Sequence, residues 1–217
     1  DGRTVDAARP IEWLKAGWQL FLKNPGIWIA QVVIGGIILI VLGVIPVLGH
    51  LAANFLALIF AAGLLMGCKS LAEGGELRID HLFAGFKQNT GNLVMVGVYY
   101  LVGIVIIFGI VFVIGGGSIF SGALIGNVAG AGVIAGGIVL AALVGLALFT
   151  PLAMAVWFAP PLVAFHNVAP LDAMKASFRV CLKNWLPFLV YGVVLLILTV
   201  LAAIPALLGL LVLVPVL

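Results

Sequence analysis

Residues 24–68 read NPGIWIAQVVIGGIILIVLGVIPVLGHLAANFLALIFAAGLLMGC and contain no Asp, Glu, Lys or Arg. A charged side chain in hydrocarbon is costly, so an uncharged and apolar stretch of this length indicates segments that lie inside a bilayer. One membrane-spanning helix needs about 20 residues, and this stretch is long enough to cross the bilayer and return. It therefore predicts a helical hairpin, with its turn at Ile45-Pro46.

The charged residues predict how the rest of the chain is arranged. A second uncharged run covers 88–171, and a third follows Lys183. The charged residues fall into three clusters: Asp1, Arg3, Asp6, Arg9, Glu12, Lys15 and Lys23; Lys69, Glu73, Glu76, Arg78, Asp80 and Lys87; and Asp172, Lys175, Arg179 and Lys183. Because a hairpin separates consecutive clusters, all three are expected on one side of the membrane. Lys and Arg are retained in the cytoplasm, which predicts a multi-pass protein of the bacterial inner (cytoplasmic) membrane with a cytoplasmic N-terminus.

The composition agrees with a membrane protein. Hydrophobic residues make up 65% of the 217 residues and charged residues 8%, far from the soluble average of about 25% charged. The mean hydropathy is +1.38. The net charge of +3 is therefore interpreted as a sign of membrane orientation. The sequence has no basic stripe with stacking aromatics, the pattern that would indicate nucleic-acid binding. Cys68 and Cys181 each adjoin a charged cluster, so two free thiols in a reducing compartment are expected.

An internal repeat links the three charged clusters. Residues 10–24, PIEWLKAGWQLFLKN, align without gaps onto 170–184, PLDAMKASFRVCLKN, and 78–92, RIDHLFAGFKQNTGN, form a weaker third copy. Each copy has the pattern of an amphipathic helix, with Pro or an acidic residue suited to its first turn. A basic helix of this kind lies in the headgroup plane and would bind anionic lipid headgroups.

A hairpin is expected after each copy. The predicted spans are 26–45, 51–69, 93–114, 134–158, 186–204 and a sixth that begins near 206. The predicted fold is an all-α, polytopic membrane domain over 1–217, with about six transmembrane helices as three parallel repeats. The repeats cover 10–69, 78–158 with a Gly-rich insertion at 115–137, and 170–217, where the third is cut short by the chain end. We expect the natural protein to continue beyond both ends.

Polar residues recur at matching places in the three repeats. The predicted helix caps are Asn24, Asn92 and Asn184, since Asn is favoured at a helix N-terminus. Seven residues later the copies place Gln31, Tyr99 and Tyr191, on the same helix face as the Asn. A polar group at membrane depth needs a partner, so these three are a candidate polar cluster around a common axis. The alternative is that the tyrosines belong to an interfacial aromatic belt.

The tract 115–137 is the most unusual segment. Its small residues recur with a spacing of four, at Ser118, Gly122, Gly126, Gly130, and again at Gly132 and Gly136. Small residues at this spacing let helices approach closely, so these are candidate helix-packing positions. A flexible outer loop and a re-entrant element that lines a cavity are the alternatives.

Catalytic chemistry has no visible basis in the sequence. The spans carry no ionisable Asp, Glu, Lys or Arg, and no nucleophile, P-loop or zinc-protease motif occurs. His50, His81 and His166 are spread over different segments, so no metal site is expected. We predict no catalytic residues, no cofactor and no enzyme activity.

A family resemblance rests on three segments: Trp157-Phe158-Ala159-Pro160-Pro161-Leu162-Val163, Ala173 to Phe178 continuing to Lys183-Asn184, and Gly209 to Pro215. With these the chain resembles an uncharacterised group of six-span bacterial inner-membrane proteins. That group is similar to the membrane domain attached to some glycerophosphodiester phosphodiesterases. The resemblance assigns no functional residues, and without the soluble domain we expect no phosphodiesterase activity.

The leading functional hypothesis is an accessory, assembly or scaffold component, as a subunit of a larger membrane complex or as a homo-oligomer. It rests on the missing catalytic chemistry and on the many small-residue packing positions. A transporter or channel for a small or apolar solute is the alternative, favoured by the repeats and the Gly-rich tract. A lipid-modifying enzyme ranks last, because no nucleophile or carboxylate pair lies at headgroup level.

Overall fold

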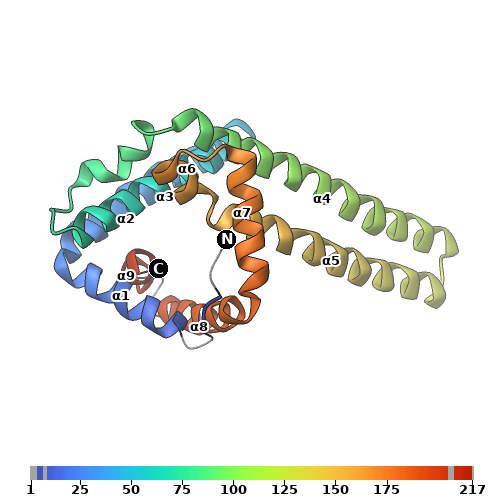
Figure 1. The fold of residues 1–217 in the computed structure, drawn as a ribbon. Coiled ribbons are helices and arrows are strands. Elements are labelled where there is room, and N and C mark those ends of the chain that lie inside the picture. Colours follow the sequence, from blue (N-terminus) through green and yellow to red (C-terminus); the bar gives the residue numbers. More distant parts are fainter. Residues whose placement is uncertain (1–3, 7–8, 205–207, 217) are drawn as a thin grey trace.

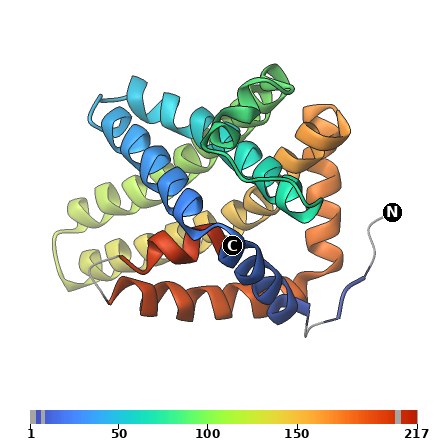
Figure 2. The same ribbon diagram turned by 90° about the vertical axis from the view of Figure 1, so that its left-hand side faces the viewer.

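The computed structural model describes residues 4–6, 9–204 and 208–216, and within these ranges it contains helices and no strands. The helices are α1 (Arg9–Lys23), α2 (Pro25–Gly43), α3 (Leu48–Ala72), the 3₁₀ helix η1 (Ile79–Phe86), α4 (Thr90–Ile125), α5 (Val128–Trp157), α6 (Ala159–His166), α7 (Pro170–Lys183), α8 (Trp185–Ala203) and α9 (Leu210–Val216). Helices α1, α2 and α8 surround α9 (Figures 1 and 2).

Five helices of the described chain are long and apolar enough to cross a membrane. They are α2, α3, α4, the α5–α6 pair counted as Val128–His166, and α8. About six spans were predicted, and the described residues contain five. Helix α9 has seven residues, and the start predicted near residue 206 lies outside the described residues.

The charged segments gather at one end of the bundle. Lys23 Nζ at the end of α1 donates to the carbonyl oxygen of Leu71 at the end of α3, 2.9 Å away. Ala173 and Met174 of α7 share a buried cluster with Leu93 in the first turn of α4. We call this end, with α1, the α3–α4 connection and α7, the charged end.

The predicted caps have three different outcomes. Asn24 and Asn184 stand at the N-cap positions of α2 and α8, although neither side chain makes a capping hydrogen bond. Asn184 Oδ1 instead accepts a hydrogen bond from the backbone N–H of Val5, at 2.8 Å. The prediction for Asn92 is wrong, because α4 begins at Thr90 and Asn89 is its N-cap. Asn89 has a left-handed backbone (φ 52°), which ends the preceding turn and lets α4 begin earlier.

The third copy of the amphipathic segment contains the 3₁₀ helix η1, and the amphipathic helix expected within 78–92 is not a single α-helix. Its close packing on α3 supplies the reason. A Cβ on Gly63 of α3 would collide with the backbone carbonyls of His81 and Leu82, and one on Gly85 with the carbonyl of Ile59. The backbone of η1 thus lies directly against α3, and the three copies do not share one geometry.

The Gly-rich tract forms the far end of a long helical hairpin. Residues 115–125 complete α4, Gly126 (φ 66°) and Asn127 make the turn, and α5 follows. This hairpin extends well beyond the other helices in Figure 1. Gly122 of α4 lies against Gly130 of α5. The tract is therefore neither a flexible loop nor a separate re-entrant element.

The remaining predicted packing positions differ in what they face. Ser118 of α4 lies against Gly137 of α5, so it belongs to the contact between the two helices. Gly126 forms the turn. A Cβ at Gly132 or Gly136 would meet nothing within 4 Å, so these two glycines face away from the described part of the chain.

Candidate functional site

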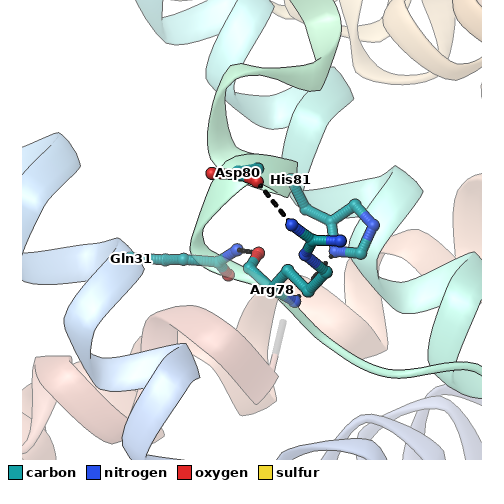
Figure 3. A network of polar contacts seen from close by, with 4 residues as sticks. All are labelled: Gln31, Arg78, Asp80 and His81. Carbon is teal, nitrogen blue, oxygen red and sulfur yellow. Dashed lines mark hydrogen bonds and ion pairs between the residues drawn. The ribbon is translucent and has the colours of Figure 1, made fainter.

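Gln31 is a fully buried polar side chain in a membrane-spanning helix. Its Nε2 donates a hydrogen bond to the backbone carbonyl oxygen of Arg78, 2.9 Å away, across the boundary between α2 and the segment that leads into η1 (Figure 3). Its Oε1 has no hydrogen-bond partner among the described residues. Since an unpaired buried acceptor costs about 1–3 kcal/mol, the single hydrogen bond to Arg78 is what offsets the burial of this amide.

Arg78 extends the contact to the surface. Its backbone N–H donates to Nδ1 of His81 at 3.1 Å, and its Nη2 lies 3.1 Å from Oδ2 of Asp80 (Figure 3). His81 therefore accepts through Nδ1. The Arg78–Asp80 ion pair has side chains 69% and 73% exposed, so it contributes little to stability.

Apolar packing surrounds the Gln31 contact. Trp28 of α2, Leu77 and Leu82 are at most 2% exposed. Gly67 of α3 provides the space, because a Cβ there would lie 2.7 Å from Cδ1 of Leu77. The arrangement is a docking site for the chain's own α3–α4 connection rather than an open cavity for a ligand.

The candidate cluster of Gln31, Tyr99 and Tyr191 does not form. Gln31 pairs with Arg78, and Tyr99 packs against the buried cluster that contains Val96. The ring of Tyr191 meets those of Trp13 and Trp157, with centroids 6.1 and 6.5 Å apart. The segment that packs next to Gln31 is the 3₁₀ helix η1, whereas the α-helix α7 packs against α4 and α5, so equivalent positions acquire different neighbours.

Aromatic side chains border a cavity between α5 and α8. The cavity has a volume of about 350 Å³, and its lining is almost wholly apolar. Trp157, Phe188 and Tyr191 line it together with Phe149 and Leu146. Such a cavity can hold a lipid chain or an apolar solute. Its polar groups are the hydroxyls of Thr150 and Tyr191 and the thiol of Cys181.

Ser177 of α7 stabilises the break between α5 and α6, a role that sequence reasoning missed. Its Oγ accepts from the backbone N–H of Phe158 at 3.0 Å and donates to the carbonyl oxygen of Met154 at 2.6 Å. Pro160 and Pro161 have no N–H and interrupt the helix at this point. The predicted span ended at residue 158, but nothing in the sequence identified the hydroxyl that stabilises this break.

Cys181 lies one turn beyond Ser177 and is 2% exposed. Burial raises the pKa of its thiol, and a hydrogen bond with the Ser177 side chain opposes that rise in part. The thiol is therefore protonated near neutral pH and is a poor nucleophile there. Its environment suits a packed side chain.

Comparison with known proteins gives one informative similarity. A protein of Burkholderia thailandensis, described as a probable inner membrane protein, is 28% identical over 195 residues, which cover 87% of this chain and 72% of that protein. No family model and no solved structure matches the chain. With the five candidate spans, the chain is a multi-pass membrane protein.

Proposed function

We propose that the chain is an accessory or scaffold component of a larger complex in a bacterial inner membrane, with a cytoplasmic N-terminus and no catalytic chemistry of its own. The observation that carries the proposal is the α4–α5 hairpin, which is uncharged throughout and longer than a bilayer is thick. The similarity to a probable inner membrane protein supports the location, and the basic residues at the charged end support the orientation.

The length of the hairpin exceeds what lipid alone can cover. Helix α4 has 36 residues, or about 54 Å at about 1.5 Å per residue. The hydrocarbon core is about 30 Å thick, and even a tilt of about 40° leaves about 41 Å along the membrane normal. The far end of the hairpin therefore reaches past the hydrocarbon core while it remains apolar.

The surface of the far end matches a protein partner. Large apolar side chains project there without a described partner: Phe112, Val113, Phe120, Leu124 and Val128. On α5, Gly132 and Gly136 leave an open strip at which another helix can approach closely. An apolar surface beyond the hydrocarbon is stable when a second protein covers it, which is the role of an accessory subunit.

The lack of reactive groups in the spans supports a non-enzymatic role. No span contains Asp, Glu, Lys or Arg between its charged flanks. The resemblance to a membrane domain attached to some glycerophosphodiester phosphodiesterases points the same way, because there the catalytic domain is separate. The uncharacterised six-span group remains the family that we propose for this chain.

A transporter for an apolar solute is the second candidate, favoured by the cavity between α5 and α8. A transporter needs a cavity that connects the two sides of the membrane. The residues that line this cavity lie along a few turns of α5 and α8 and at the end of α7. Solute uptake that is lost when Gly192 is replaced by Trp would favour the transporter over the scaffold.

Site-specific photocrosslinking in native membranes tests the proposal. A photoreactive side chain would replace Phe120 on the hairpin or, as the control, Leu196 on α8; the natural residues are 68% and 66% exposed. We expect one discrete adduct with a different protein from position 120 and lipid adducts from position 196. Lipid adducts alone from both positions would overturn the proposal.

A further inference from the structure

A polar cavity opens at the charged end, away from the Gln31 contact. Its volume is about 350 Å³, and unlike the cavity between α5 and α8 its lining is mostly polar. It is lined by Lys69, Gln88, Asn89, Ala164, Phe165 and Asn167. These residues come from α3, the connection before α4, and α6 with the residue that follows it.

The polar groups of this cavity suit an anion. Lys69 provides the positive charge, with Nζ 5.5 Å from the centroid of the Phe165 ring. Asn89 Nδ2 donates to the carbonyl oxygen of Val163 at 3.1 Å and to Oδ1 of Asn167. The Asn167 oxygen is thereby engaged, which leaves its Nδ2–H groups as donors for a ligand.

The carboxylate nearest to Lys69 does not close the cavity. Glu73 Oε1 lies 3.9 Å from Lys69 Nζ, and both side chains are more than half exposed, so their attraction is weak. Glu73 is one helical turn beyond Lys69 and does not line the cavity. The lining itself contains no acidic residue.

An apolar cavity adjoins the polar one. Its volume is about 290 Å³, and Phe158, Pro161, Leu162 and Val180 are among the residues that line it. Phe165 lines both cavities, so a cationic, amide-rich space and an apolar one adjoin at this residue. That pairing matches a molecule with an anionic head and a hydrocarbon chain.

We propose that these two cavities bind one anionic phospholipid of the leaflet at the charged end. The phosphate lies in the polar cavity, where Lys69 and the amides of Gln88 and Asn167 donate to its oxygens. One acyl chain passes Phe165 and occupies the apolar cavity beside Leu162. The lysine and the amide donors of the polar cavity bind the anionic phosphate. The apolar cavity binds the acyl chain, which distinguishes a lipid from a soluble phosphate.

Native mass spectrometry of the purified full chain, titrated with lipid, tests the site. Phosphatidylglycerol should bind as a single tight copy, and diacylglycerol, which has the acyl chains but no phosphate, should bind at least about tenfold more weakly. Lys69→Gln should weaken phosphatidylglycerol binding about tenfold, through the loss of a charge-assisted contact. The matched control is Lys175→Gln, which removes an exposed α7 lysine that lies outside both cavities and pairs with Asp172 at 3.9 Å.

A second variant separates the lipid from free phosphate. Leu162→Trp fills the apolar cavity, so it should weaken phosphatidylglycerol binding and leave inorganic phosphate binding unchanged. Equal losses from Lys69→Gln and Lys175→Gln would overturn the site, because binding would then be a general surface attraction. Inorganic phosphate that binds as tightly as the lipid, with no effect of Leu162→Trp, would overturn the assignment to a lipid.

Discussion

Gln31 and Arg78 are 47 positions apart in the sequence, and the side-chain amide of the first donates to the backbone carbonyl of the second at 2.9 Å. A polar side chain inside a membrane-spanning helix thus binds the backbone of the connection between two other spans. The contact is fully buried on the Gln31 side. It holds η1 against α2 and α3 at the charged end, next to the start of the long hairpin.

The first prediction concerns the close packing of η1 on α3. Gly63→Ala places a methyl group 2.5 Å from the carbonyl oxygen of Leu82, so we expect a loss of about 1–3 kcal/mol in the free energy of unfolding. The control is Gly36→Ala in α2, where a Cβ meets nothing within 4 Å. Hydrogen exchange over 79–86 should accelerate in the first variant alone. Unchanged exchange in Gly63→Ala would show that η1 is not held by this contact.

The second prediction concerns the break between α5 and α6. Ser177→Ala removes the acceptor for Phe158 N–H and the donor to Met154, so unfolding in detergent should become easier by about 1–3 kcal/mol. Thr150→Val is the control, because the Thr150 hydroxyl donates only to Leu146 of its own helix. Equal thermal stability of the two variants would contradict the role assigned to Ser177.

The third prediction concerns the contact between α4 and α5. Gly130→Leu forces a side chain against the backbone of Gly122, and a Cβ there already lies 3.2 Å from that of Ile125. We expect the two helices to separate and the protein to lose about 1–3 kcal/mol of stability or more. Gly132→Leu, on the open face of the same helix, should unfold at the wild-type temperature. The same destabilisation in both variants would be inconsistent with the described orientation of α5.

The fourth prediction concerns the thiol of Cys181. Because burial raises its pKa, the thiolate population at pH 7 is lower than that of an ordinary thiol. In a Cys68→Ser background, alkylation should be slow at pH 7 and should keep rising about tenfold per pH unit beyond the pH at which an exposed thiol levels off. A cysteine at the exposed Lys87 position, with both natural cysteines replaced, is the reference. Identical pH profiles for the two thiols would contradict the prediction.

The sequence was sufficient to predict the helical class, the approximate places of five spans and the breaks before α2 and α8. These features depend on local causes. A charge is costly in hydrocarbon wherever it occurs, and proline favours the first turn of a helix, where Pro25 lies. The spacing of small residues in the Gly-rich tract is also a local pattern, so close helix packing could be predicted there. Gly122 and Gly130 provide this packing.

The sequence was not sufficient for features that depend on distant segments. The repeat suggested equal roles for Gln31, Tyr99 and Tyr191. Yet Gly63, Gly67 and Gly85 bring the 3₁₀ helix η1 directly against α3, while its counterpart α7 is an α-helix packed on α4 and α5. The backbone partner of Gln31 has no sequence signature, since every residue carries a carbonyl. Asn92 was misplaced as a cap because Asn89, three residues earlier, adopts the left-handed conformation.

We propose that the α4–α5 hairpin binds a different protein subunit on its open face. The most direct test is the mass of the particle released gently from native membranes, compared between the wild type and Gly132→Leu. We expect a wild-type particle that contains a second, different protein at a fixed ratio, and a Gly132→Leu particle that has lost this protein while the chain stays folded. A wild-type particle that contains only this chain and lipid, or one that Gly132→Leu leaves intact, would contradict the claim.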